Sequence, residues 1–216
     1  MKPLIIFRNL LPLFFCACVA TAPIKKPVSA PAGTAVVHDL STNEGRHAAF
    51  RETKTWKSKI FKDEEVIAIA KPDNIRVQIV LDEQRGYLFV NDLIGYDFPV
   101  STGRKSRPTP TGEYKILVKE LKHHSNLYGK IVDAEGNVTN ANADVSKHIP
   151  EEGSTFKGAP MPYFMRLTND GVGMHIGSLP GYAASHGCIR LPRLVAPKIY
   201  AVAPVGTRVS ITKNRT

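Results

Sequence analysis

Polar and apolar residues alternate in several short segments of this chain, and such alternation is typical of strands with one buried face. Residues 75–81 alternate in this way, and residues 86–91 follow after a polar turn, so together they predict a β-hairpin. Only residues 194–202, after Pro192, have a helical pattern. Further strands are predicted at residues 94–101, 112–119, 163–167, 173–176 and 208–211. The pattern therefore predicts a mainly β domain of sandwich or barrel type, with one or two short helices.

Two long segments lack a hydrophobic period. Residues 120–160 contain four glycines and several asparagines, which predicts a long inserted loop, and its place between predicted strands suggests a lid over a binding site. Within it, His123 and His124 are adjacent on an irregular segment, a pattern more typical of solvated side chains than of a metal site. Residues 23–50 are rich in Ala, Pro, Ser, Thr and Gly, and residues 23–65 are predicted to form a flexible linker with a short N-terminal extension.

The beginning of the chain has the pattern of an export signal. Lys2 and Arg8 form a positive region ahead of the apolar residues 10–20, and small residues follow. This apolar stretch is too short to span a bilayer. Residues 1–22 are therefore predicted to be a signal peptide, with export to the periplasm or cell envelope. As an alternative, Cys18 resembles the lipidated cysteine of a bacterial lipoprotein signal, which would attach the protein to a membrane through an N-terminal lipid.

The chain is basic, with a formal net charge of +10. Loss of Lys2 and Arg8 with the signal would leave about +8, since no acidic residue precedes Asp39. In an exported protein this charge favours cell-wall polymers and acidic peptides over nucleic acid, for which the chain has no binding motif. A basic surface that only aids solubility is an equal alternative. Removal of the signal also leaves Cys188 without an internal partner, so no disulfide is expected.

Candidate chemistry centres on the run Ser-His-Gly-Cys-Ile-Arg at residues 185–190. A thiolate is the nucleophilic form of cysteine, and the flanking His186 and Arg190 are groups that could favour it at Cys188. Gly187 allows a turn that leaves backbone amides free to face an oxyanion. A buried, inert cysteine is the simplest alternative. A structural zinc site is disfavoured because the paired ligand spacing is missing.

In several separated blocks the sequence resembles the YkuD-type L,D-transpeptidases of bacterial cell-wall assembly. The resemblance covers residues 74–212 and implies a YkuD-like β-sandwich or barrel-type catalytic domain at residues 66–216. The blocks that carry it, all in the family's order, are residues 75–91, 100–103, 108–112, 174–175, 185–191 and 206–209.

The resemblance also implies roles for individual residues, and it implies neither a metal nor a cofactor. Cys188 would be the nucleophile and His175 its base, with the carbonyl of Ile176 orienting the imidazole ring. Backbone amides of His186, Gly187 and Cys188 would form an oxyanion hole. Substrate binding would fall to Arg190, Ser185 and Tyr163.

The implied substrate is the stem peptide of peptidoglycan. Cys188 would attack the carbonyl of the third residue of a tetrapeptide, release D-alanine, and pass the acyl group from the thioester to an amine of a second stem, giving a 3-3 cross-link. Water as acceptor would make the protein an L,D-carboxypeptidase, and a lipoprotein as acceptor would attach that protein to the wall. A non-catalytic peptidoglycan-binding module is a third alternative. Papain-like proteolysis is disfavoured because Cys188 lies late in the domain. The resemblance further implies acylation of the thiol by carbapenems.

Overall fold

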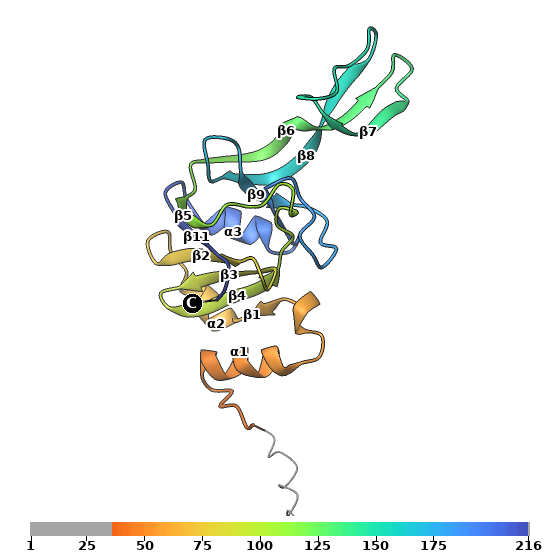
Figure 1. The fold of residues 1–216 in the computed structure, drawn as a ribbon. Helices are drawn as coiled ribbons and strands as arrows, with labels where there is room; N and C mark the ends of the chain where they lie inside the picture. The colour runs from red at the N-terminus through yellow and green to blue at the C-terminus, as the bar shows by residue number, and fades with distance from the viewer. Residues whose placement is uncertain (1–35, 216) are drawn as a thin grey trace, which may run out of the picture. The chain divides into compact units, whose positions relative to one another are not determined.

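The computed structural model describes residues 36–215, which form two β-sheets and a few helices (Figure 1). The first sheet has the strand order β1-β4-β3-β2-β11-β5, with β1 (Phe61–Lys62), β2 (Ile75–Val80), β3 (Arg85–Val90), β4 (Leu93–Pro99), β5 (Gly112–Lys115) and β11 (Arg208–Thr212). The second has the order β10-β9-β8-β6-β7, with β6 (Val118–Val132), β7 (Val138–Asp144), β8 (Thr155–Arg166), β9 (Gly173–Ile176) and β10 (Ile189–Leu191). The helices are α1 (Asn43–Glu52), η1 (Trp56–Ser58), α2 (Glu64–Ala68) and α3 (Ala196–Val202).

The mainly β prediction is confirmed, and the predicted hairpin is strands β2 and β3. They pair antiparallel, with Val77 opposite Leu88. The other segments predicted as strands also overlap strands, but residues 112–119, predicted as one strand, are divided between β5 in the first sheet and the start of β6 in the second. β11 pairs parallel to β2, with Ile211 opposite Ile79, so a late segment of the chain joins the middle of the first sheet. The predicted helix is α3, and α1 and α2 bring the α-helices within residues 36–215 to three, one or two more than expected.

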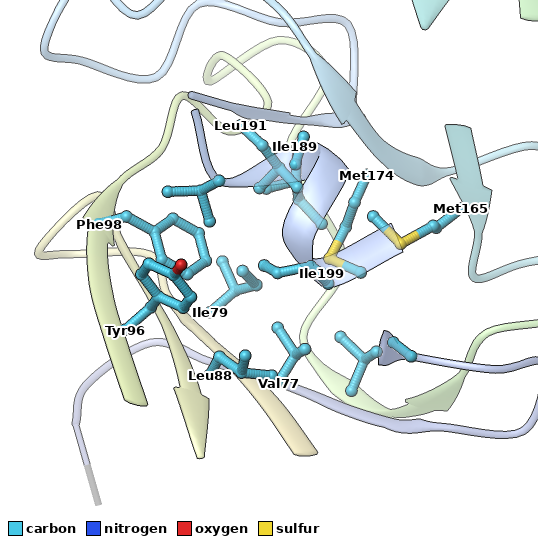
Figure 2. Packing of buried hydrophobic residues seen from close by; sticks show 14 of the residues in the cluster. Val77, Ile79, Leu88, Tyr96, Phe98, Met165, Met174, Ile189, Leu191 and Ile199 are labelled. Atoms are coloured by element: carbon cyan, nitrogen blue, oxygen red, sulfur yellow. The ribbon is translucent and has the colours of Figure 1, made fainter. Parts of the chain in front are cut away.

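The hydrophobic core lies between the two sheets and includes one face of α3 (Figure 2). Fully buried apolar side chains from both sheets and from α3 form one cluster. Along β10, Ile189 and Leu191 point into this core, while Arg190 between them is only half-buried. Burial of alternate residues therefore fixes the orientation of β10, and with it the direction in which Arg190 points. Members of the cluster labelled in Figure 2 include Val77, Ile79, Leu88, Met165, Met174, Ile189, Leu191 and Ile199.

Residues 120–160 are not the long irregular loop that the sequence predicts. They belong mostly to β6, β7 and β8, and β6 pairs with β8 from Val118 opposite Arg166 to Val132 opposite Thr155. In Figure 1 this pair continues past the other strands of its sheet, with β7 beside its far part. We call residues 118–166 the β-arm. Within it, β6 and β7 are largely exposed, so these two strands have no continuous hydrophobic side that a sequence pattern could show.

Part of the segment predicted as linker and extension is helix α1. Two polar side chains attach it to the first sheet. The Asn43 side chain bonds both to Asp63, at 2.7 Å, and to the backbone of Ile94, and His47 Nε2 lies 2.8 Å from Asp97. The predicted signal peptide, Cys18 and the first part of the linker lie outside the described residues. No helix within residues 36–215 is long and apolar enough to cross a membrane.

Candidate functional site

The parallel pair β9 and β10 brings the predicted nucleophile and base to one place. Arg190 is the register partner of His175, and Cys188 immediately precedes β10. Cys188 and His175 both line a cavity of about 610 Å³. Ser185, His186 and Arg190 line the same cavity. Residues that are separated in the sequence thus meet at the end of two neighbouring strands.

The surroundings of His175 set its tautomer and its charge. Its Nδ1 lies 2.8 Å from the carbonyl oxygen of Ile176, the contact that the family resemblance implies. Because a carbonyl oxygen only accepts, Nδ1 carries the hydrogen and Nε2 is left as a proton acceptor. Burial is the main cause that lowers the pKa of His175 to about 4, so the imidazole is neutral at pH 7.

The Cys188 thiol lies in an environment that does not favour a resting thiolate. Burial raises its pKa and outweighs a hydrogen bond from the Gly173 backbone and the charge of Arg190, which both act in the opposite direction. The thiol Sγ lies 3.7 Å from the carbonyl oxygen of Gly171, within reach of a weak hydrogen bond. Arg190 therefore favours the thiolate as expected, but burial has the larger effect on the pKa of Cys188 and acts in the opposite direction.

The turn that carries Cys188 is held by hydrogen bonds on both sides. Gly187 has φ of 124°, a conformation that glycine adopts without strain. Thr109 Oγ1 donates to the Gly187 carbonyl at 2.6 Å and accepts from the Gly103 amide at 2.8 Å. Ser185 Oγ accepts from the Gly187 amide at 3.1 Å and donates to the Cys188 carbonyl. The Ser185 and Thr109 hydroxyls thus determine the shape of this turn.

These contacts change the composition of the predicted oxyanion hole. The Gly187 amide is already bonded to Ser185 Oγ. The amides of His186 and Cys188 form no hydrogen bond with another residue in the described part of the chain. A carbonyl oxygen of a substrate at Cys188 would therefore find two free donors rather than three.

Residues 101–109, for which the sequence predicted no role in the site, hold the turn that carries Cys188. Ser101 and Arg190 exchange two backbone hydrogen bonds, and the Ser185 amide donates to the Thr102 carbonyl at 2.9 Å. Ser101, Thr102 and Thr109 are all buried. All three lie in the blocks at residues 100–103 and 108–112, which resemble the family but to which the sequence assigned no role.

Of the three residues predicted to bind substrate, the structure brings two to the cavity. Arg190 Nη1 donates to Ser178 Oγ at 3.2 Å, and Ser185 lies in the turn. Tyr163 does not line the cavity. Its ring packs edge-to-face against Tyr200 with centroids 5.5 Å apart, and its place in a substrate groove stays a prediction.

The β-arm lies against the turn on its other side. The Tyr128 ring stacks on His186 with centroids 4.2 Å apart, and Arg107 Nη2 lies 3.4 Å from Asp144 of β7. Burial, followed by the charges of nearby arginines, lowers the pKa of His186. These contacts position the β-arm as a wall of the site, and its role as a lid stays a prediction.

His123 of the β-arm also lines the cavity, but its contacts are not those of a metal ligand. Its ring stacks on Phe164 with centroids 4.2 Å apart, and Nδ1 lies 2.8 Å from Glu120. Within residues 36–215, no three His, Cys, Asp or Glu side chains gather closely enough to hold a metal ion.

Comparisons with known proteins identify the family. A curated relative from Bacillus licheniformis, named "Putative L,D-transpeptidase YkuD", is 27% identical over 149 residues, which are 67% of this chain and 70% of that protein. A solved L,D-transpeptidase from Mycobacterium smegmatis is 21% identical with a TM-score of 0.48, over 64% of this chain and 58% of its own. A solved LD transpeptidase in complex with imipenem is 21% identical with a TM-score of 0.49, over 65% and 59%. The chain thus spans less than two thirds of both solved structures. Residues 74–211 match the family model described as the L,D-transpeptidase catalytic domain, and the protein belongs to this YkuD family.

Proposed function

We propose that this protein is a peptidoglycan L,D-transpeptidase that works through a thioester on Cys188. The observation that carries the proposal is the meeting of Cys188 and His175 in one cavity, with His175 Nδ1 bonded to Ile176 and Nε2 left as an acceptor. Export, by the signal peptide predicted at residues 1–22, would bring this site to its polymer, and the predicted basic charge suits an acidic wall peptide.

In the first step, Cys188 Sγ attacks the carbonyl carbon of the third residue of a donor tetrapeptide. His175 Nε2 accepts the thiol proton during this attack, because a raised thiol pKa and a lowered imidazole pKa both oppose a resting ion pair. The free amides of His186 and Cys188 stabilise the oxyanion. The protonated imidazole then gives its proton to the amine of the departing D-alanine, leaving a thioester.

In the second step, an amine of a second stem attacks the thioester carbon. A C–N bond forms as the C–S bond breaks, and the amine proton returns through His175 to the Cys188 sulfur. The product is a 3-3 cross-link. Arg190 is the proposed partner of a donor carboxylate, since a guanidinium binds such a group with two parallel hydrogen bonds.

Purified protein incubated with disaccharide tetrapeptides would test the proposal, with products resolved by mass. Dimers that have lost D-alanine are the expected result. Tripeptide without dimer would make the protein an L,D-carboxypeptidase through the same site. No loss of D-alanine, with a substrate of the correct chemistry, would refute both activities.

Two further experiments test the assignment of Cys188 as the nucleophile. Cys188→Ala should abolish turnover with little change in folding, because one sulfur atom is removed from a site open to substrate. A carbapenem should add its mass to the wild-type protein and not to this variant. An unmodified wild-type mass would refute the assignment of Cys188 as the nucleophile.

A further inference from the structure

A second cavity lies next to the one that holds the thiol. It has a volume of about 410 Å³ and is lined by all three strands of the β-arm together with His186 and Arg190. Tyr128, His186 and Arg190 line both cavities. The stacked rings of Tyr128 and His186 therefore belong to the wall that the two cavities share.

The second cavity carries an uncompensated positive charge. Lys130 of β6 and Lys157 of β8 both line it, and they are direct register partners across the antiparallel pair. Side chains directly opposite each other point to the same face about 5 Å apart at Cβ, and like charges in such a pair destabilise the sheet. Arg190 adds a third cation to the lining.

No acidic side chain balances these charges. The lining contains no Asp or Glu, and within residues 36–215 neither Lys130 nor Lys157 forms an ion pair or a side-chain hydrogen bond. Arg107, which lines the first cavity, differs from these lysines because it pairs with Asp144. A lysine pair that costs stability and has no partner in the protein is suited to an anion from outside.

Small residues let the strands that line this cavity approach each other closely. Gly129, Ala143, Gly158 and Ala159 line the cavity, and at Gly129 and Gly158 a Cβ would lie 2.1 Å from a backbone oxygen of the facing segment. The two strands thus approach closely without side chains between them. Lys130 and Lys157 follow and precede these glycines on exposed positions, where a carboxylate can reach them without being fully desolvated.

We propose that the second cavity binds the acyl acceptor, and that Lys130 and Lys157 select an acceptor peptide that carries a free carboxylate. The inference rests on the proposed function, because it assigns the amine of the second step to a peptide held in the cavity that adjoins the one lined by Cys188. The lysines are positioning residues that hold the carboxylate, and the covalent step is the exchange of the C–S bond for a C–N bond given above. Water needs no such contact, so the lysines favour transfer over hydrolysis.

Binding without turnover tests this assignment. In the Cys188→Ala background, a stem tripeptide with free carboxylates and the same peptide with its carboxylates amidated are titrated by calorimetry at low ionic strength. We expect the carboxylate form to bind about threefold to tenfold more tightly, the scale of two exposed ion pairs. Lys130→Met with Lys157→Met should remove most of this preference. The matched control is Lys122→Met, an exposed lysine of the same strand that lines neither cavity.

A kinetic arm uses the protein with Cys188 intact. The double lysine variant should form fewer dimers and more tripeptide than wild type, at an unchanged rate of carbapenem acylation. Equal binding of the two peptides, or a carboxylate preference as large in the double variant as in the Lys122→Met control, would overturn the inference. Failure to release D-alanine would instead refute the proposed function, since the calorimetric result does not depend on turnover.

Discussion

Because His175 is buried, the stability of the folded protein should depend on pH between pH 4 and pH 6.5. The imidazole is 7% exposed, and burial lowers its pKa from the ordinary 6.5 to about 4. In the unfolded chain the same ring takes up a proton near its ordinary pKa. Between these two values the unfolded state binds more protons than the folded one, so stability falls as the pH falls from 6.5 toward 4. Above pH 6.5 the ring is neutral in both states and contributes no such penalty.

The size of this effect follows from the difference between the two pKa values. A difference of this size corresponds to about 3 kcal/mol of lost stability at pH 4, and to about 2 kcal/mol at pH 5. His175→Asn removes the titration, and its amide can still donate to the Ile176 carbonyl in place of Nδ1. The variant should be less stable than wild type at pH 7, because packing is lost, but its stability should fall less on acidification.

The assay is urea unfolding of both proteins at pH 7, 5 and 4, with the free energy of unfolding extrapolated to water. The quantity to compare is the difference in free energy of unfolding between wild type and His175→Asn, and how it changes with pH. Carboxylates that titrate in this range are common to both proteins, so their effect cancels in this difference. His124→Asn, at an exposed position of β6, controls for the substitution itself. If wild type and His175→Asn lost the same free energy between pH 7 and pH 4, burial would not be what keeps His175 neutral.

Three further predictions concern the framework around the site. Asp97→Asn should lower the free energy of unfolding, measured in urea, by about 3–5 kcal/mol. The fully buried Arg85 guanidinium, whose Nε lies 2.6 Å from the Asp97 carboxylate, would lose its charge partner. A decrease under about 1 kcal/mol would contradict this. Thr109→Val keeps the side-chain shape but leaves the Gly187 carbonyl without its hydroxyl donor, so the free energy of unfolding should fall by about 2 kcal/mol. Carbapenem acylation, followed by intact mass, should also slow. Acylation at the wild-type rate would show that the turn holds its shape without this bond. Gly103→Ala should lower the melting temperature, since its Cβ would lie 2.2 Å from a carbonyl oxygen, at a cost of about 2 kcal/mol or more; an unchanged melting temperature in calorimetry would mean that the loop moves freely.

The sequence predicted those parts of the fold in which short strands carry many buried apolar side chains. β2 is buried at all positions except Arg76, β3 is buried throughout, and the short β9 is an apolar run that carries His175. Cys188 was identified from its neighbours, since glycine and histidine beside a cysteine are a local pattern. These features are visible in a linear chain because each depends on residues that are close in sequence.

Other features depend on contacts that a linear pattern does not contain. β7 is built of Val, Thr, Asn and Ala with most side chains exposed, so its strand character comes from pairing with β6 rather than from an apolar face. Helix α1 buries Asn43 and His47 instead of apolar residues, and these two find their partners far along the chain. The ring of Tyr163 packs against Tyr200 on α3, a contact between distant positions that the sequence of its strand does not contain.

The pairing of β11 with β2 has a consequence for how the domain folds. Residues 76–80 find their parallel partners only in residues 208–212, and β5 also pairs with β11. The first sheet therefore depends on contacts of very high sequence separation, which is typical of slowly folding topologies. During synthesis the hairpin of β2 and β3 can form early, whereas the edge of β2 stays open until residues 208–212 have emerged. The turn around Cys188 also precedes β11 in the chain, so the residues of the proposed site are synthesised before the first sheet can be completed.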